Sequence, residues 1–218
     1  MEQSLRRYTE LPYLIDYLQT KEIVLLNPAS WDDRNDSYYI EQFALANGYK
    51  STYALCLANA SETYHHWRVF SHGGSGVCIE FDTEKLLLAV KAIPGLRAES
   101  VKYKTIDALR ETAPLSEDLP FLKRYAFSAE SEFRLFYGSH EAGAPVMRVP
   151  VPLSCIKRIT LSPWLTKSVV DHVKKTLKSI TGCGSLKIYK STLVENENWK
   201  KFAGNITIEK TNTKIPNS

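Results

Sequence analysis

The sequence predicts an α+β fold in which helices flank a mixed, mostly antiparallel sheet. The strand patterns are short and irregularly spaced along the 218 residues, and helical patterns separate only some of them. A doubly wound parallel sheet would need a regular alternation of strand and helix, which the chain lacks. Hydrophobic residues make up 44% and charged residues 24% of the chain, so a sizeable core is expected and wholesale disorder is not.

The expected strands are short apolar or alternating runs that end at turn-forming residues. The clearest is 77–81, where Val77, Ile79 and Phe81 alternate with Cys78 and Glu80. The full set is 5–9, 23–26, 52–57, 77–81, 99–104, 130–138, 146–151, 156–161 and 186–189.

The expected helices follow from apolar residues at helical spacing and from capping residues. Thr9 is expected to cap the first helix, which runs to about Gln19. Ser168 is expected to cap the clearest helix, which Gly182 closes. The expected helices are 10–19, 38–45, 62–70, 83–92 and 168–180, together with a mostly helical stretch at 106–127 that Pro114 and Pro120 interrupt.

The polar segment 31–36 is expected to be a loop, and 72–76 a flexible connector. No internal repeat or low-complexity tract divides the chain. We therefore expect a single domain over residues 1–218, with its core at about 5–194 and a frayed tail in the last dozen residues.

Charge and cysteine usage narrow the class of protein. The net charge of +4 and the pI of about 8.7 allow an anionic ligand or a nucleic-acid partner without requiring one. The N-terminus lacks the apolar core of a signal peptide, and no apolar run approaches the ~18 residues of a membrane span. The four cysteines are far apart without metal-ligand spacing, and Cys78 is expected to be a buried free thiol. These features predict a cytoplasmic protein with no metal and no membrane partner.

Glu130, Glu132 and Arg134 are the strongest candidates for a reaction centre. On a strand, residues two apart share a face, so both carboxylates and the guanidinium would project together. Two like charges repel, which tends to raise one carboxylate pKa, and a paired arginine offsets the repulsion. The pattern fits either a solvated strand face with an ion pair or a carboxylate pair that serves a charged transition state. Phe133 and Leu135 are expected to face the core.

Two further segments are candidates for binding. Arg6 and Arg7 precede Tyr8 and Thr9 at the start of the fold, where two guanidinium groups either hold an anion or form ordinary surface charge. Trp67 is either a core residue or a stacking platform for a ligand.

Several of these segments together resemble a bacterial family of unknown function, domain family 2971. The resemblance spans most of residues 5–194, with Phe70, Phe127 and Ala129 departing from the family's aromatic positions. The matching positions are Arg7-Tyr8-Thr9, Asn27-Pro28-Ala29-Ser30-Trp31, Asn35-Asp36, His66-Trp67, Gly76-Val77-Cys78-Ile79-Glu80-Phe81, Lys123, Glu130, Glu132, Arg134 and Ile156-Lys157-Arg158-Ile159.

That family's layout is similar to the ADP-ribosyltransferase-like fold. The resemblance implies that Arg7 and Tyr8 hold the nicotinamide end of NAD as substrate, and that Glu132 or Glu130 bonds the nicotinamide ribose. It also implies cofactor-binding roles for Thr9, Asn35, Trp67 and Arg134. The implied function is an ADP-ribosyltransferase-like enzyme that acts as a bacterial toxin or phage-defence effector on a nucleic-acid or protein acceptor.

Two other hypotheses remain open from the sequence. One is a non-catalytic module that binds nucleic acid or a partner protein within a defence or toxin–antitoxin system. The other is a different NAD or nucleotide hydrolase that uses the same carboxylates. The sequence identifies neither the acceptor nor the oligomeric state.

Overall fold

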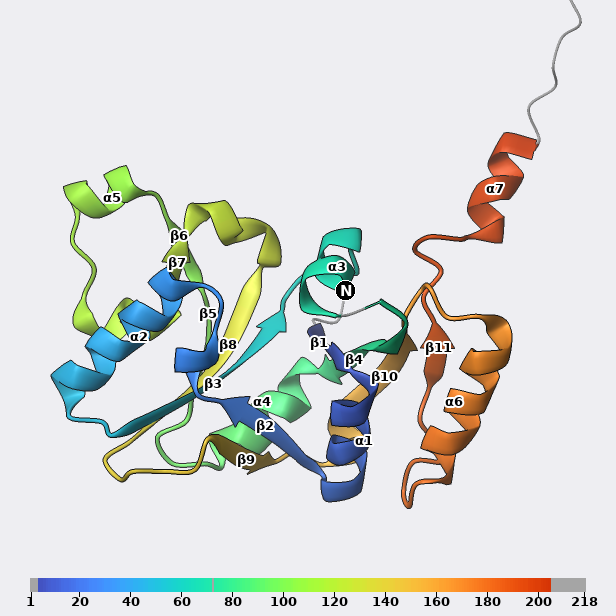
Figure 1. Cartoon of the computed structure of the whole chain (residues 1–218), viewed down its shortest axis with the longest axis horizontal. Coiled ribbons are helices and arrows are strands. Elements are labelled where there is room, and N and C mark those ends of the chain that lie inside the picture. Colours follow the sequence, from blue (N-terminus) through green and yellow to red (C-terminus); the bar gives the residue numbers. More distant parts are fainter. Residues whose placement is uncertain (1–3, 72, 205–218) are drawn as a thin grey trace, which may run out of the picture.

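The computed structural model describes residues 4–71 and 73–204 (Figure 1). The tail expected to fray and residue 72 of the expected connector lie outside the described residues. Within the described residues, nine strands form one sheet in the order β11-β10-β4-β1-β3-β2-β9, with β8 paired to β3 and β5 paired to β8. These strands are β1 Ser4–Glu10, β2 Glu22–Leu26, β3 Ser51–Ala58, β4 Gly76–Asp82, β5 Arg97–Ser100, β8 Glu132–Ser139, β9 Val146–Pro150, β10 Ile156–Leu161 and β11 Ile188–Lys190.

All neighbouring strands of this sheet are antiparallel except β10 and β11. A separate parallel pair joins β6 (Lys102–Lys104) to β7 (Leu122–Arg124). The prediction of a mixed, mostly antiparallel sheet with flanking helices is thus confirmed. The helices are α1 Leu11–Thr20, α2 Arg34–Asn47, α3 Tyr64–Phe70, α4 Thr83–Lys91, α5 Ile106–Glu111, α6 Lys167–Ser179 and α7 Glu197–Gly204.

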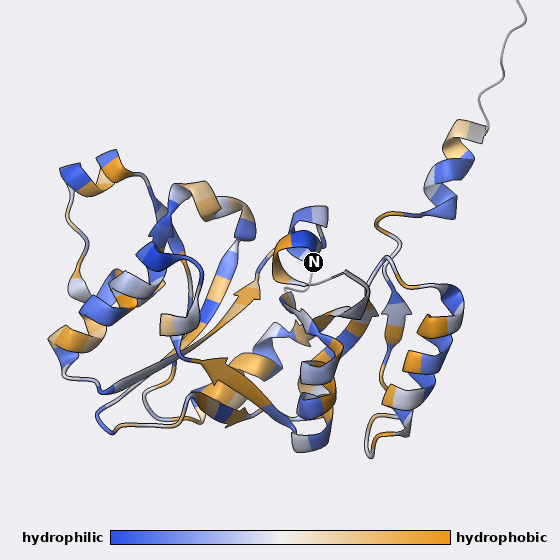
Figure 2. Ribbon diagram, in the orientation of Figure 1, coloured by the Kyte–Doolittle hydropathy of each residue, from blue (hydrophilic) through white to orange (hydrophobic). Residues whose placement is uncertain are grey.

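The main core lies between the sheet and the helices that cover it. Leu14 and Leu18 of α1 and Leu86 of α4 are completely buried against strand residues such as Ile79. A second cluster packs α2 onto β3 and β8. Figure 2 shows hydrophobic residues along the strands and on parts of each helix, while hydrophilic residues dominate the other helical faces. Burial of this apolar surface is the main favourable term in folding.

Both faces of β8 are covered. Leu135 belongs to the main core, whereas Phe136 on the opposite face packs into the cluster under α2. Arg134 shares that second face and is also completely buried. The expectation that Leu135 faces the core is confirmed, and the polar residues of β8 are therefore enclosed rather than solvated.

The sheet opens between β1 and β3. These two strands pair at a single position, Arg6 with Ala58, although β1 pairs with β4 along its whole length. Near the middle of β3, the pairing with β2 is again limited to one position, Leu26 with Ala54. Between these two contacts the strands diverge, so a hollow can form inside the sheet.

Several boundaries differ from the sequence predictions. The expected polar loop 31–36 already contains the start of α2, because the Asp33 side chain accepts hydrogen bonds from the amides of Asn35 and Asp36 and caps the helix. Thr9 and Ser168 are not caps: Glu10 and Thr166 occupy the cap positions of α1 and α6, and neither makes a side-chain cap hydrogen bond.

Two expected elements are divided. The strand expected at 99–104 is interrupted at Val101, whose amide donates to the Glu132 carbonyl oxygen (2.9 Å). The stretch 106–127 contains α5, two 3-10 helices and β7 instead of a continuing helix. Pro120 lies inside the first 3-10 helix, Ser116–Phe121, where it lacks the amide that a continuing α-helix needs.

Four free cysteines are present, and Cys78 is buried as expected. None of the described helices has the length and apolar character to cross a membrane. Among the described residues, no group of three or more His, Cys, Asp or Glu side chains is placed to hold a metal ion.

Candidate active site

A cavity of about 320 Å³ occupies the opening between β1 and β3. Small-molecule sites are typically of about this size or larger. Its lining combines apolar strand and loop residues with cations and carboxylates. The lining residues are Arg6, Arg7, Tyr8, Thr9, Glu10, Tyr13, Leu26, Trp31, Ala54, Leu55, Cys56, Leu57, Ala58, Phe70, Lys123, Glu130 and Glu132.

The diverging strands bring main-chain polar groups to this cavity. Leu55, Cys56 and Leu57 of β3 pair with β8 on one side, and none of the described strands pairs with them on the side toward β1. Arg7 and Tyr8 of β1 likewise pair only with β4. Peptide groups are strong hydrogen-bonding groups, so the inner edges of both strands can serve a ligand.

Arg7 places a positive charge in the cavity wall without a counter-charge. No carboxylate of the described residues forms an ion pair with it, and its hydrogen bond is a long one from Nη1 to the Val24 carbonyl oxygen (3.5 Å). Burial lowers the pKa of Arg7 to about 10, although Cys56 and Tyr17 raise it slightly. The guanidinium therefore stays charged at neutral pH and is available to an anionic or polar ligand.

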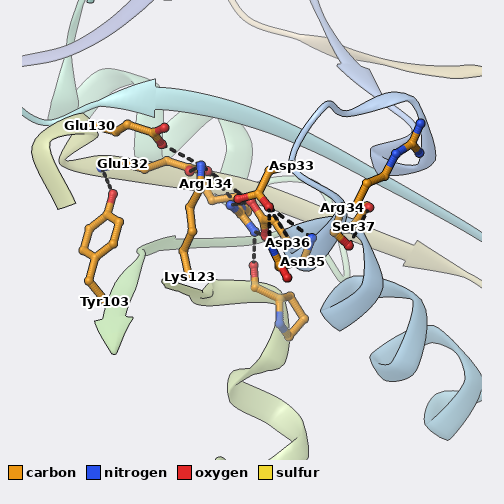
Figure 3. Close-up of polar contacts among 11 residues, drawn as sticks. Asp33, Arg34, Asn35, Asp36, Ser37, Tyr103, Lys123, Glu130, Glu132 and Arg134 are labelled. Carbon is orange, nitrogen blue, oxygen red and sulfur yellow. Dashed lines mark hydrogen bonds and ion pairs between the residues drawn. The ribbon is translucent and has the colours of Figure 1, made fainter. Parts of the chain in front are cut away.

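Glu132 lies across the cavity and is held by two cations (Figure 3). Arg134 Nε donates to Oε1 of Glu132 (2.6 Å), and Lys123 Nζ donates to Oε2 (3.3 Å). Lys123 also donates to Glu130 Oε2 (2.6 Å) and thereby connects the two carboxylates. Charge-assisted hydrogen bonds of this kind are strong and directional, so the Glu132 side chain is fixed.

Asp36 completes the cluster from the first turn of α2. Its two oxygens accept from Nη1 and Nη2 of Arg134 at 2.8 and 2.6 Å, and Arg134 also donates to the Pro120 carbonyl oxygen (2.8 Å). Three carboxylates thus share two cations, Lys123 and Arg134, which leaves one excess negative charge when all are ionised. Glu130 and Glu132 are the two carboxylates of this cluster that reach the cavity wall.

The environment separates the protonation behaviour of the two glutamates. Burial alone would raise the pKa of Glu132, but Arg134 and Lys123 outweigh it and lower that pKa to about 2. Burial raises the pKa of Glu130 in spite of its contact with Lys123. Two neighbouring carboxyl groups with opposite pKa shifts suit different roles, one permanently charged and one able to exchange a proton.

The Glu130 position corrects the strand interpretation. Glu130 ends a 3-10 helix (Tyr125–Glu130), and β8 begins only at Glu132. Ser131 between them has φ 46°, a left-handed conformation that cannot belong to a strand. The two carboxylates therefore meet through Lys123 and the bend at Ser131, not through the two-residue repeat of a strand.

The structure brings Tyr8 and Thr9 to the same cavity as Arg7 and Glu132. The Tyr8 ring stacks on His66, with ring centres 5.3 Å apart, and meets Trp67 edge to face. The strands predicted at 5–9 and 130–138 thus converge on one cavity, which no local pattern in the sequence requires.

Three of the expected cofactor-binding residues do not line this cavity. Trp67 is completely buried in a small core cluster, where its indole nitrogen donates to Glu62 (2.6 Å). Arg134 is completely buried behind Glu132. Asn35 lies on a different cavity and donates to Asp33 (3.2 Å). Neither the Trp67 nor the Arg134 side chain reaches the surface in this structure.

Sequence reasoning gave no role to Lys123 or Asp36. Lys123 lies seven and nine residues before Glu130 and Glu132, in the segment that resembles domain family 2971, and that resemblance is the signal that could have pointed to it. Asp36 contacts Arg134 across 98 positions of the chain, and nothing in the local sequence indicates this pairing.

The lowered pKa of Glu132 predicts a pH-dependent cost for replacing Glu132 by glutamine. A depressed carboxyl pKa stabilises the fold above the unfolded value of 4.5, and this stabilisation is lost as the pH falls toward about 2. The loss of unfolding free energy in Glu132→Gln should therefore be largest at neutral pH and shrink below about pH 4. Urea unfolding of the wild type and of Glu132→Gln at several pH values measures this loss. A loss that is independent of pH would contradict the ion-pair geometry.

Comparison with known proteins gives a limited result. No family model and no curated protein matches the chain, so membership of domain family 2971 stays a prediction. Among solved structures, the chain is similar to DarT of Thermus sp. 2.9 in complex with ADP-ribosylated ssDNA, with 12% identity and a TM-score of 0.46 over 87% of this chain and 94% of that one. It is also similar to the same protein in complexes with carba-NAD+ and NAD+, with 10% and 9% identity, a TM-score of 0.45 and coverage of 87% of this chain and 96% of those chains.

Proposed function

We propose that the chain is an ADP-ribosyltransferase-like enzyme that consumes NAD in the cavity between β1 and β3. The observation that carries the proposal is the meeting of an unpaired guanidinium, Arg7, and an ionised carboxylate, Glu132, in the wall of one cavity. Arg7 and Tyr8 hold the nicotinamide end of NAD, and Glu132 bonds the nicotinamide ribose.

The reaction breaks the bond between the nicotinamide nitrogen and the ribose carbon. The electron pair leaves with nicotinamide, and an oxocarbenium-like positive charge develops on the ribose, as it does in glycoside cleavage. The excess negative charge of the carboxylate cluster lies at the cavity wall and stabilises this charge. Arg134 and Lys123 fix Glu132 before the reaction, so little reorganisation is needed during it.

Glu130 supplies the second step in this proposal. Its raised pKa makes it a proton acceptor for the group that attacks the ribose. The new bond joins the ribose carbon to the acceptor, and the acceptor's proton moves to Glu130. The acceptor is a nucleic-acid or protein group, or water if the enzyme is a hydrolase. Product analysis separates these outcomes, because hydrolysis yields free ADP-ribose and transfer yields a modified acceptor.

The direct test is release of nicotinamide by the purified chain incubated with NAD and a bacterial lysate. The proposal expects release above that of a heat-denatured sample, together with an ADP-ribosylated product. A native protein that releases no more nicotinamide than the denatured sample refutes the enzymatic proposal. Growth arrest on expression of the wild type, and its loss in the Glu132→Gln variant, tests the toxin or defence role.

Replacing Arg7 by methionine should weaken NAD binding by about tenfold or more, because a charge-assisted hydrogen bond to the ligand is lost. Methionine keeps most of the volume, so the cavity should persist. Titration calorimetry with a non-hydrolysable NAD analogue measures the affinity. Arg148→Met is the matched control: it removes an exposed guanidinium on β9 that is bonded to Asp16 and does not line the cavity, so NAD binding should be unchanged.

A further inference from the structure

A second cavity of about 370 Å³ lies beside the proposed active site, between the first turns of α2 and the β6–β7 pair. Lys123 lines both cavities, so the two share part of one wall. Residues of α5 also contribute to the wall of the second cavity. The lining residues are Arg34, Asn35, Asp36, Tyr38, Tyr39, Lys104, Ile106, Leu109, Leu122, Lys123 and Arg124.

The charge of this second cavity is positive. Within residues 4–71 and 73–204, Arg34, Lys104 and Arg124 have no ion-pair partner, and the Arg34 guanidinium donates one hydrogen bond, to the Ala29 carbonyl oxygen (3.3 Å). Asp36 is the single carboxylate in the wall, and Arg134 occupies both of its oxygens. Arg34, Lys104 and Arg124 are exposed at this cavity, and an anion there can pair with them.

Lys104 and Arg124 lie next to each other. They are register partners in the parallel pair of β6 and β7, where neighbouring strands are about 4.8 Å apart. The side chains of register partners project from the same face of a strand pair, so one anion can contact both cations. A phosphate group fits this requirement, since it accepts hydrogen bonds from both side chains.

The opposite wall offers aromatic surface. Asn35, Tyr38 and Tyr39 are three and four residues apart on α2, so they share one side of the helix. Tyr38 is largely exposed, and both tyrosines line the cavity. Ile106, Leu109 and Leu122 add apolar surface. Aromatic side chains beside cations are the combination that binds a base and its phosphate.

We infer that the second cavity binds a nucleotide, with Lys104 and Arg124 on its phosphate and Tyr38 or Tyr39 stacked on its base. The nucleotide is either free or part of a single strand, since both present the same phosphate and base. The second cavity shares Lys123 with the cavity that Glu130 lines, and this location makes the second cavity the acceptor site of the reaction. The assignment as acceptor site rests on the proposed function.

The inference is tested by binding without NAD, so that it does not depend on catalysis. The probes are AMP and a fluorescent single-stranded oligonucleotide of about twelve nucleotides, titrated between about 50 and 200 mM salt. The Lys104→Glu/Arg124→Glu double variant should bind its probe at least about tenfold more weakly than the wild type. For the strand, the salt dependence should become shallower by roughly 0.7 per lost phosphate contact.

A charge-matched control separates a site from general attraction. Lys175→Glu/Lys178→Glu changes the net charge equally on the exposed side of α6, outside the second cavity, and should keep wild-type affinity. Tyr38→Ala should weaken binding, and Tyr38→Phe should restore it. Binding of AMP identifies a free nucleotide, and binding of the oligonucleotide alone identifies a strand.

Binding of neither probe overturns the inference, as does equal weakening by the α6 control. A wild type that binds a probe at this cavity but never releases nicotinamide refutes the proposed enzyme and leaves the nucleotide site standing. A wild type that cleaves NAD but binds neither probe supports the proposed enzyme and refutes the nucleotide site.

Discussion

Replacing Glu132 by glutamine is expected to lower nicotinamide release from NAD by roughly 10²- to 10³-fold, the usual effect of removing one aimed electrostatic group. Glutamine keeps the shape of the side chain but removes the charge that faces the developing oxocarbenium ion. Since that charge acts on the transition state, kcat should fall while KM for NAD changes little. Steady-state measurement of nicotinamide release gives both parameters.

Glu99→Gln is the matched control for this experiment. Glu99 lies on the neighbouring strand β5, is paired with Arg97 and does not line the cavity, so its activity should remain at the wild-type level. Thermal unfolding of Glu132→Gln at the assay pH separates lost catalysis from lost folding. A folded Glu132→Gln variant with wild-type kcat would exclude Glu132 as the group that stabilises the transition state.

Replacing Arg134 by methionine is expected to reduce the free energy of unfolding by about 3–5 kcal/mol. The substitution leaves Asp36 and Glu132 buried with one cation, Lys123, between them, and the Pro120 carbonyl oxygen loses its partner. Breaking a buried ion pair from one side is costly because the remaining charge cannot return to water. Urea unfolding at neutral pH, followed by tryptophan fluorescence, measures the change.

Arg148→Met provides the comparison at the surface. Arg148 forms a bidentate ion pair with Asp16, but the side chains of Arg148 and Asp16 are well exposed, at 41% and 37%. Exposed pairs contribute about 0–1 kcal/mol, so this variant should remain close to the wild type in stability. A similar cost for both substitutions would contradict the difference in burial between the two arginines.

The local parts of the fold were predictable, because strand and helix periodicities act over a few residues. The strands around Tyr8, Ile79 and Leu135 and the α1 helix appear close to where apolar spacing indicates them. Helix starts were less predictable: Glu10 and Thr166 hold the cap positions without capping hydrogen bonds, so the side-chain chemistry that usually marks a helix start is absent there.

The candidate site was predictable only in part. The spacing of Glu130, Glu132 and Arg134 indicates a charged cluster, but a left-handed residue between the two glutamates, Ser131, changes how they meet. Asp36 enters the cluster through a contact that the chain makes only after folding, so its role is invisible in a local pattern. Trp67 illustrates the opposite case, since an aromatic residue can serve either the core or a ligand and only packing decides which.

The divergence of β1 and β3 has a consequence for which groups of the protein can contact a ligand. Between the Arg6–Ala58 contact with β1 and the Leu26–Ala54 contact with β2, β3 presents amide and carbonyl groups at the regular spacing of extended backbone. The positions of these main-chain groups follow from the backbone conformation and do not depend on which side chains the residues carry. A ligand bound in this gap, as proposed, can therefore keep its main-chain contacts when the surrounding side chains are substituted.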